Sequence, residues 1–423
     1  MLELYPHQQD ALKATADKNK VAYYLDMGLG KTFVGSEKML QLGNKVNLVI
    51  CQKSKVDDWI EHFKTYYRTN KADVYDLTDK KGFEWFFNQH SPGMVYGVIN
   101  YELAFRRKEL LKLSDFTLML DESSLIQNKT AKRTKFIMRL KYSNLILLSG
   151  TPTGGKYEKL WTQLNMLGYN VDEKAFYNMY VDYHYDNNEG FPIQIIDGYK
   201  NVERLKRKMA AHGCVFMKSE EVFNLPAQTF IDVKINATKD YRKFRKDCIL
   251  ITEDVELVGD TTLTKMLYER QLCGQYNEDK LKAFLDLLES TEDRLIVFYN
   301  FTAELEALKC LCDSVQRSYS VVNGLDKDLY AYENENASIT LIQYQAGAMG
   351  LNLQKANKIV YFTPPLSSEL YEQSKKRIHR IGQQQPCFYY RLICRNSIEE
   401  HIYATLEMRK DYTDALFEKE GTN

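Results

Sequence analysis

The sequence has no excess of charge of either sign, since 57 lysine and arginine residues balance 57 aspartate and glutamate residues. Proteins that coat nucleic acid through charge alone are usually strongly basic, so this balance disfavours such a coat but still allows a local basic groove. The eight cysteines include no CxxC pair, and the neighbouring Cys310 and Cys312 do not have zinc-ligand spacing. We therefore expect free thiols and no zinc site.

The sequence also lacks an apolar run of about 18 residues, the length that predicts a membrane-spanning helix. Its first ten residues, MLELYPHQQD, are too polar for a signal peptide. We expect a soluble, monomeric, cytoplasmic protein that does not act at a membrane. The lysine-, asparagine- and tyrosine-rich composition would suit a bacterial cell or a bacterial host infected by a virus.

Two stretches of the chain alternate short apolar runs with helical patterns. The first has strand-like runs at residues 21–25, 46–51, 95–100, 116–120 and 145–148, and helical patterns at 55–66 and 156–167. The second has strand-like runs at 294–299, 319–322, 339–343 and 358–362, and helical patterns at 301–312 and 370–381. This alternation predicts parallel sheets covered by helices on both faces.

A middle region of different texture separates these two α/β lobes. It contains amphipathic helical patterns at 202–211 and 240–251, a tyrosine-rich stretch at 176–185 and a turn at 186–190. At roughly 100–200 residues per domain, the length favours two or three domains. We expect lobe 1 at residues 1–170, small helical protrusions and a linker at 171–280, and lobe 2 at 281–423.

A glycine-rich turn follows the first predicted strand and reads DMGLGKT, ending in Lys31 and Thr32. Such a turn at a helix start points backbone N–H groups at an anion, and the helix dipole adds positive charge. Lys31 can then reach the β- and γ-phosphates of a nucleotide, and the Thr32 hydroxyl can hold Mg²⁺. Leu25 stands where the full phosphate-loop pattern has glycine, so the motif alone also fits an ordinary turn.

Two further segments place polar groups directly after predicted strands. Asp121 and Glu122 follow an apolar run, at the sheet edge where ligands bind in such folds. Asp121 would complete the Mg²⁺ shell and Glu122 would orient and deprotonate the attacking water. The segment Ser-Gly-Thr-Pro at 149–152 adds hydroxyl groups suited to sensing the state of this site.

The segment QSKKRIHRIGQ, residues 373–383, contains an arginine pair. If the segment is helical, Arg377 and Arg380 lie on one face, with Gln373 one turn earlier. Two guanidinium groups entering a phosphate site from another domain would stabilise transition-state charge. A solvated basic helix face is the alternative, but the order of phosphate loop, acidic pair, SGTP and arginine pair favours a split ATP site.

These segments together resemble the Swi/Snf-type branch of helicase superfamily two, whose members are ATP-dependent translocases on duplex DNA. The matching segments cover nearly the whole chain, at residues 5–8, 25–32, 48–63, 98–102, 147–155, 160–167, 295–301, 345–353 and 373–383. The family's phosphate loop also lacks the first glycine, and the RIGQ ending is specific to this branch. The resemblance implies two RecA-like lobes in tandem with small helical protrusions between them.

The resemblance also implies roles for individual residues. Gln8 would read adenine, and residues 98–102 would contact a DNA strand. The residues expected to bind ATP and Mg²⁺ are Gln8, Gly28, Leu29, Gly30, Lys31, Thr32, Asp121 (to the metal through water) and Gly350 of the fifth motif. The expected catalytic residues are Lys31, Glu122, Arg377 and Arg380.

The sequence departs from the family pattern at several positions. Ser124 stands where a histidine is usual, Ala348 replaces a glycine, and Asn357 replaces an aspartate. We expect an ATP- and Mg²⁺-dependent motor on double-stranded DNA, with protein partners left open. A strand-separating helicase is an alternative, although no wedge-like insertion is evident. A DNA-binding scaffold gated by ATP without turnover is a second alternative, which the intact catalytic residues disfavour.

Overall fold

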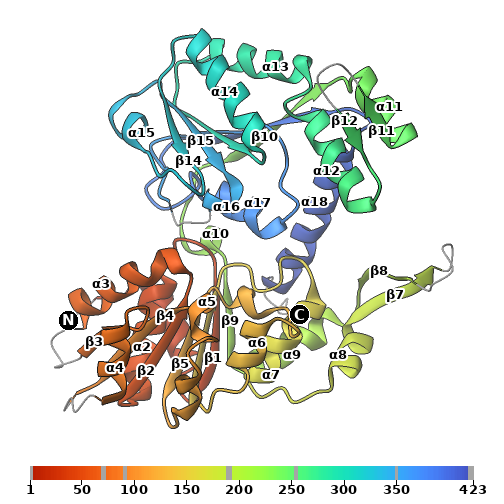
Figure 1. The fold of residues 1–423 in the computed structure, drawn as a ribbon. Coiled ribbons are helices and arrows are strands. Elements are labelled where there is room, and N and C mark those ends of the chain that lie inside the picture. The colour runs from red at the N-terminus through yellow and green to blue at the C-terminus, as the bar shows by residue number, and fades with distance from the viewer. Residues whose placement is uncertain are drawn as a thin grey trace. The chain divides into compact units, whose positions relative to one another are not determined.

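The computed structural model describes residues 3–67, 73–88, 93–186, 193–251, 256–347 and 351–417. The chain divides into two compact units, Met1–Val222 with Asp411–Asn423 and Phe223–Lys410. From here on, lobe 1 and lobe 2 denote these two units and not the ranges expected from the sequence. Each lobe is built on a parallel β-sheet that helices cover (Figure 1). The expected α/β fold class, with two parallel-sheet lobes in tandem, is confirmed.

Lobe 1 contains a seven-stranded sheet in which every neighbouring pair of strands is parallel. In spatial order its strands are β3 (Asp73–Asp76), β4 (Val95–Asn100), β2 (Val46–Cys51), β5 (Thr117–Asp121), β6 (Asn144–Ser149), β1 (Lys20–Leu25) and β9 (Cys214–Met217). Its helices are α1 (Pro6–Lys13), α2 (Lys31–Leu42), α3 (Val56–Tyr66), α4 (Lys80–Asn88), α5 (Tyr101–Ala104), α6 (Lys132–Ile137), α7 (Trp161–Met166), α8 (Glu173–Tyr180), α9 (Val202–Ala211) and α10 (Ser219–Val222).

Lobe 2 contains a six-stranded sheet that is also parallel throughout. In spatial order its strands are β10 (Gln228–Ile235), β17 (Cys387–Cys394), β16 (Lys358–Tyr361), β13 (Leu295–Tyr299), β15 (Ile339–Gln343) and β14 (Tyr319–Val322). Its helices are α11 (Lys239–Asp247), α12 (Thr262–Cys273), α13 (Glu278–Glu289), α14 (Thr302–Ser314), α15 (Tyr330–Asn334), α16 (Tyr344–Gly347), α17 (Ser368–Lys375) and the first part of α18 (Ile398–Phe417).

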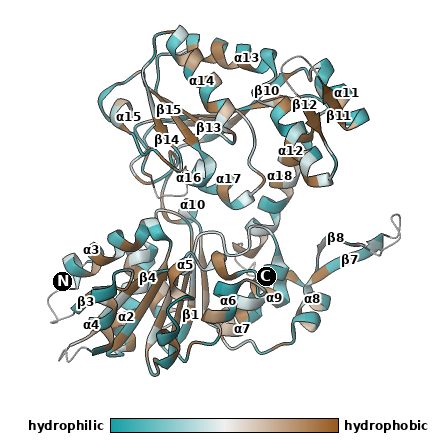
Figure 2. Cartoon of the chain, in the orientation of Figure 1, coloured by the Kyte–Doolittle hydropathy of each residue, from teal (hydrophilic) through white to brown (hydrophobic). Residues whose placement is uncertain are grey.

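The strands form because runs of β-branched and aliphatic residues can be buried on both sheet faces. Figure 2 shows that the central strands are hydrophobic along their length, whereas the helices carry polar residues as well. In β13, Leu295 and Val297 belong to one apolar cluster, and Ile296 and Phe298 to another. Because side chains alternate along a strand, the two clusters lie on opposite faces of the lobe 2 sheet.

A glycine sets the distance between α2 and the lobe 1 sheet. A Cβ atom on Gly35 would lie 2.8 Å from the sulfur of Met119 and 3.0 Å from Cδ1 of Leu148. Only a residue without a side chain lets the helix approach β5 and β6 this closely. This close packing fixes the start of α2, and with it the glycine-rich turn, at the carboxyl ends of the strands.

The middle of the chain is less helical than the sequence predicts. Within it lie two antiparallel hairpins, one of β7 (Val181–Asp186) and β8 (Ile193–Tyr199) and one of β11 (Ile249–Ile251) and β12 (Glu256–Val258). The prediction of a helix over 240–251 is therefore wrong after Asp247. The predicted turn at 186–190 falls almost entirely outside the described residues.

The predicted helix over 370–381 is also shorter than expected, because α17 ends at Lys375. The backbone then tightens into turns, in which Arg377 N donates to Ser374 O at 3.2 Å and Gln383 N donates to Arg380 O at 3.0 Å. The two arginines therefore do not share a helix face. Across the described ranges, no helix is long and apolar enough to cross a lipid bilayer.

Candidate ATP site

The glycine-rich turn joins the end of β1 to the start of α2 in lobe 1. Gly28 and Gly30 have positive φ angles of 89° and 73°, which favour glycine. Lys31 is the first helical residue, and its ammonium group donates to the carbonyl oxygens of Leu25 at 2.9 Å and Asp26 at 3.2 Å. The lysine is thus held over the turn whose backbone N–H groups precede the helix.

Helix α1 contacts this turn through its own polar side chains. The Gln8 side-chain amide donates to the carbonyl oxygen of Leu29 at 3.2 Å, and its Oε1 accepts from the backbone N–H of Tyr5 at 3.0 Å. A Cβ atom on Gly30 would lie only 2.2 Å from Nε2 of Gln8. A larger residue at Gly30 would therefore displace Gln8 from the turn.

The acidic pair lies at the end of β5. Oδ2 of Asp121 accepts a hydrogen bond from the indole Nε1 of Trp59 at 2.8 Å. Burial raises the pKa of Asp121, while this hydrogen bond and the charge of Lys31 oppose the increase. Glu122 has a φ of 54°, a left-handed conformation that is uncommon for residues other than glycine. Asp121 and Lys31 are therefore electrostatically linked.

The SGTP segment follows β6 beside the lysine. A Cβ atom on Gly150 would lie 3.4 Å from Nζ of Lys31, so the segment passes next to the ammonium group. The hydroxyl of Ser149 accepts from the backbone N–H of Thr151 at 3.2 Å. The structure thus brings together the phosphate loop, the acidic pair and the SGTP segment at one edge of lobe 1.

Gln163 links these segments, although the sequence did not single it out. Its side chain is fully buried, and its Nε2 donates to the carbonyl oxygen of Pro152 at 2.9 Å. Its Oε1 accepts from Ser123 Oγ at 2.8 Å and from Tyr24 Oη at 3.0 Å. One amide therefore connects β1, the residue after the acidic pair and the SGTP segment.

The arginine segment belongs to lobe 2. Arg377 is 2% exposed, and its guanidinium donates to the carbonyl oxygen of Leu351 at 3.2 Å. Arg380 is partly exposed, and burial lowers its pKa. Gln373, one helical turn before Arg377, is 7% exposed. Gly350, the expected nucleotide contact of the fifth motif, lies outside the described residues.

The edge of lobe 1 has the donor set that a magnesium-bound nucleotide needs. A Cβ atom on Gly28 would meet nothing within 4 Å, so there is open space beside the turn. The N–H groups at the start of α2 and the Lys31 ammonium suit phosphate oxygens. Thr32, in the first turn of α2, and the carboxylate of Asp121 supply the oxygen ligands that Mg²⁺ prefers.

The sequence matches two protein-family models. Residues 22–278 match the SNF2-related domain, and residues 279–382 match the helicase conserved C-terminal domain. The chain belongs to the SNF2-related family.

Relatives of this SNF2-related chain include eukaryotic and bacterial proteins. It is 24% identical over 429 residues to human SWI/SNF-related matrix-associated actin-dependent regulator of chromatin subfamily A member 1, covering 91% of this chain and 40% of that protein. It is 23% identical over 432 residues to an uncharacterized ATP-dependent helicase of Mycoplasma pneumoniae, covering 94% and 40% respectively. The chain thus spans less than half the length of these relatives.

One solved structure aligns with nearly the whole chain. The Sulfolobus solfataricus SWI2/SNF2 ATPase core, solved in complex with double-stranded DNA, aligns with a TM-score of 0.46 and 18% identity. The alignment covers 98% of this chain and 92% of that one.

The departure at Ser124 has a structural context in this SNF2-related chain. Ser124 is 6% exposed and lies in the short turn after the acidic pair. Its neighbour Ser123 contacts Gln163, which in turn contacts Pro152. A connection between the acidic motif and the SGTP segment therefore exists here through a glutamine.

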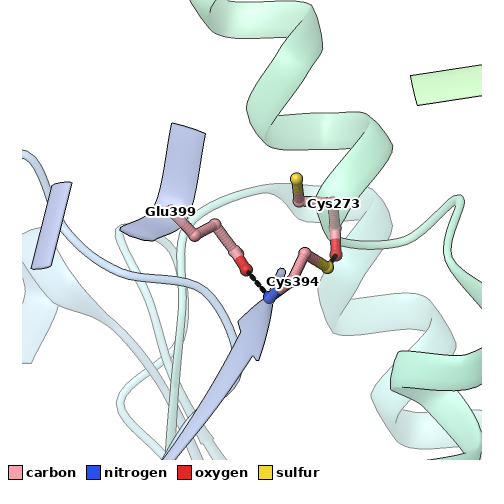
Figure 3. A group of neighbouring side chains, drawn as sticks. All are labelled: Cys273, Cys394 and Glu399. Carbon is pink, nitrogen blue, oxygen red and sulfur yellow. Dashed lines mark hydrogen bonds between the residues drawn. The ribbon is translucent and has the colours of Figure 1, made fainter. Parts of the chain in front are cut away.

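A second group of polar side chains lies buried in lobe 2, where Cys273, Cys394 and Glu399 have potential ligand atoms within 4.8 Å of one another (Figure 3). Lys280 already donates to Glu399 at 2.6 Å, and the backbone N–H of Cys394 donates to the other carboxylate oxygen at 2.9 Å. The ammonium group supplies the positive charge that a metal ion would bring. All eight cysteines are free, as expected.

Proposed function

We propose that this chain hydrolyses ATP in response to double-stranded DNA and moves along the duplex without separating its strands. The observation that carries the proposal is the gathering of Lys31, Asp121 and the SGTP segment at one sheet edge, in a chain whose residues 22–278 match the SNF2-related domain. ATP use agrees with the ATP-dependent helicase named among its relatives.

The proposed nucleotide ligands lie on the loops and helix starts described above, with one in the fifth motif. They are Gln8, Gly28, Leu29, Gly30, Lys31, Thr32, Asp121 and Gly350. Bound Mg²⁺, held by Thr32 and through water by Asp121, would neutralise charge on the phosphate oxygens. Glu122 would orient the attacking water and accept its proton.

The arginine pair completes the proposed site from lobe 2. We propose that closure of the two lobes brings Arg377 and Arg380 to the phosphates held by lobe 1, where their charge stabilises the transition state. The present contact of Arg377 with Leu351 favours Arg380 as the group that reaches furthest. In this scheme, DNA controls lobe closure rather than nucleotide binding.

A groove in lobe 1 is our candidate for contact with a DNA strand. It has a volume of about 400 Å³ and lies at the carboxyl ends of β2 and β4. Exposed Lys53 and Arg106 line it, and so do Asn100 and Glu102 of the segment expected to contact DNA. The carboxylates of Asp57 and Glu102 also line the groove and balance its two cations, so we propose phosphate contacts specifically from Lys53, Arg106 and the Asn100 amide.

Other parts of the proposal concern organisation and setting. We propose residues 1–170 and 281–423 as the functional motor lobes, with 171–280 as protrusions and linker that also supply the edge strands β9 and β10 to the two sheets, and with Asp411–Asn423 packed in the lobe 1 unit. We further propose a cytoplasmic, monomeric motor of a bacterial cell or of a virus-infected bacterial host.

The proposal is tested by phosphate release with ATP in the presence of duplex DNA, single-stranded DNA, branched DNA or RNA. We expect duplex DNA to stimulate phosphate release most. We also expect the motor, as it moves along a blunt duplex, to displace a third strand that is bound to this duplex as a triplex. Efficient unwinding of a forked duplex would instead establish a strand-separating helicase. ATP binding without stimulated release would establish the scaffold alternative.

A further inference from the structure

The carboxylate of Glu304 is buried at the carboxyl edge of the lobe 2 sheet. Glu304 lies in the first turn of α14 and is fully buried. Its Oε2 accepts hydrogen bonds from the backbone N–H groups of Asn300 at 2.8 Å and Phe301 at 3.1 Å, and from the hydroxyl of Thr363 at 3.0 Å. One oxygen atom therefore joins the loop after β13 to the loop after β16.

The junction of β15 and α16 is tied to the same group. Gln343, the last residue of β15, donates through Nε2 to the carbonyl oxygen of Asn300 at 3.2 Å. Tyr344 begins α16, and its buried hydroxyl donates to the carbonyl oxygen of Thr363 at 2.9 Å. The side-chain amide of Asn300 donates to the Thr363 hydroxyl at 2.9 Å. The loops after β13 and β16 and the junction of β15 and α16 thus share one hydrogen-bonded network centred on Glu304.

The space around this carboxylate is closely filled. A Cβ atom on Gly274 would lie 2.3 Å from Oε1 of Glu304, so α12 ends directly against the carboxylate. The guanidinium of Arg270 lies 5.1 Å from the centre of the Phe301 ring and donates to the carbonyl oxygen of Pro364 at 3.3 Å. The network therefore extends to a buried cation that touches two of the same loops.

Keeping a carboxylate in this position has a cost. Burial raises the pKa of Glu304 to about 7, opposed by its backbone hydrogen bonds, by the charge of Lys280 and by Thr363. Burial also lowers the pKa of Arg270, the other nearby cation, because it disfavours the charged form. Apolar side chains of similar volume often fill buried sites with equal or greater stability than charged groups. We therefore infer that the main contribution of Glu304 is to the arrangement of the segments it joins, and not to the stability of the lobe.

We propose that Glu304 is a positioning residue for ATP hydrolysis, which holds the loops after β13 and β16 and the junction of β15 and α16 in one fixed arrangement. The fifth-motif segment begins at the β15–α16 junction, and the loop after β16 leads through α17 to Arg377 and Arg380. Misplacement by about 1 Å of a group that stabilises the transition state can lower a rate by roughly two orders of magnitude. This inference rests on the proposed ATPase function.

Two substitutions separate the hydrogen-bonding role from simple filling of space. Glu304→Gln keeps an acceptor oxygen for the three donors, whereas Glu304→Met keeps a similar length but removes the acceptor. We expect Glu304→Met to lower the DNA-stimulated kcat about tenfold or more, with the KM for ATP changed less than about twofold, and Glu304→Gln to retain most of the wild-type kcat. Glu306→Met is the matched control, because Glu306 is exposed on the same helix and pairs with Lys309 at 3.1 Å.

Hydrogen exchange of the backbone amides provides a readout that does not need turnover. Glu304→Met should accelerate exchange at Asn300 and Phe301, and Glu304→Gln should protect both amides nearly as well as the wild type. Unchanged exchange and kcat in Glu304→Met would overturn the proposal, and so would equal loss of kcat in both variants. A wild-type protein without ATPase activity would contradict the proposed function instead, while the exchange result would still decide whether Glu304 orders the loops.

Discussion

The indole Nε1 of Trp59 donates a hydrogen bond of 2.8 Å to Oδ2 of Asp121, the residue we propose to hold Mg²⁺. The two residues lie on α3 and at the end of β5, so the bond joins a helix to the carboxyl edge of the sheet. A hydrogen bond of this kind orients the carboxylate and stabilises its charged form. Trp59 therefore acts on the proposed metal site through Asp121.

Replacing Trp59 with phenylalanine should weaken the response to magnesium. Burial already raises the pKa of Asp121, and loss of the indole donor should raise it further, so that protons compete better with Mg²⁺. We expect the Mg²⁺ concentration for half-maximal ATPase activity to rise about tenfold, with the largest effect at low pH. Magnesium titration of the ATPase measures this. Trp85→Phe is the control because Trp85 is 63% exposed, and an equal shift in both variants would contradict the account.

Gln163 should affect turnover more than nucleotide binding. Gln163→Leu removes the amide that joins Ser123 to Pro152 and leaves the buried Tyr24 hydroxyl without this acceptor. We expect kcat to fall about tenfold and thermal stability to fall by about 1–3 kcal/mol. Steady-state kinetics and thermal unfolding, with partly exposed Asn165→Leu as the control, distinguish this from general damage. A raised KM with unchanged kcat would contradict the linking role.

The two arginines should respond differently to substitution. Arg377→Ala removes a buried group and leaves the Leu351 carbonyl without its donor, so lobe 2 should lose about 1–3 kcal/mol of stability. Arg380→Ala should leave the fold unchanged while lowering kcat by roughly a thousandfold, with ATP binding retained. Thermal unfolding, a fluorescent-nucleotide binding assay and ATPase kinetics test both statements. Equal loss of binding and turnover in Arg380→Ala would argue against a transition-state role.

Glu304 should make stability depend on pH in a direction set by its raised pKa. Its pKa is about 7 in the folded protein against an ordinary value of 4.5, so the folded state holds this proton more tightly than the unfolded chain. The favourable contribution of Glu304 to the free energy of unfolding is fully present below pH 4.5 and is lost as the pH rises through about 7.

Between about pH 5.5 and 8.5, titration of Glu304 should lower the free energy of unfolding by about 2 kcal/mol. Glu304→Gln should remove this pH-dependent change. The comparison is the difference between wild type and variant in calorimetric unfolding, because all other titrating groups are common to both. Tryptophan fluorescence would miss the effect, since Trp59, Trp85 and Trp161 all lie in lobe 1. Parallel pH profiles for the two proteins would contradict the assignment.

Most central strands were predictable because their apolar runs are continuous, although β17, which pairs with both β10 and β16, was not predicted. The strands at 46–51, 95–100, 319–322 and 339–343 have the predicted bounds. β10 was missed because it is an edge strand whose residues are mostly exposed or half-buried. The end of α17 was missed because its turns depend on contacts such as that of Arg377 with Leu351, which lies far away in the sequence.

In the candidate site, too, some features could be predicted from the sequence and others depend on contacts made only in the folded chain. The phosphate loop, the acidic pair and SGTP carry local patterns that the sequence displays directly. Trp59 lies in a segment that resembles a family motif, but its contact with Asp121 is not visible in the sequence, and neither are the contacts of Gln163 with Ser123 and of Glu304 with Thr363, because each joins residues at least 40 positions apart. Only folding brings those partners within hydrogen-bonding distance.

The most direct test of the central claim is phosphate release from ATP with and without duplex DNA, measured for the wild type, Lys31→Ala and Lys64→Ala. Lys64 is exposed on α3 and serves as the control for loss of one positive charge in lobe 1. We predict strong stimulation by duplex DNA in the wild type and in Lys64→Ala, and none in Lys31→Ala. Release that duplex DNA does not stimulate, or that Lys31→Ala does not abolish, would contradict the account.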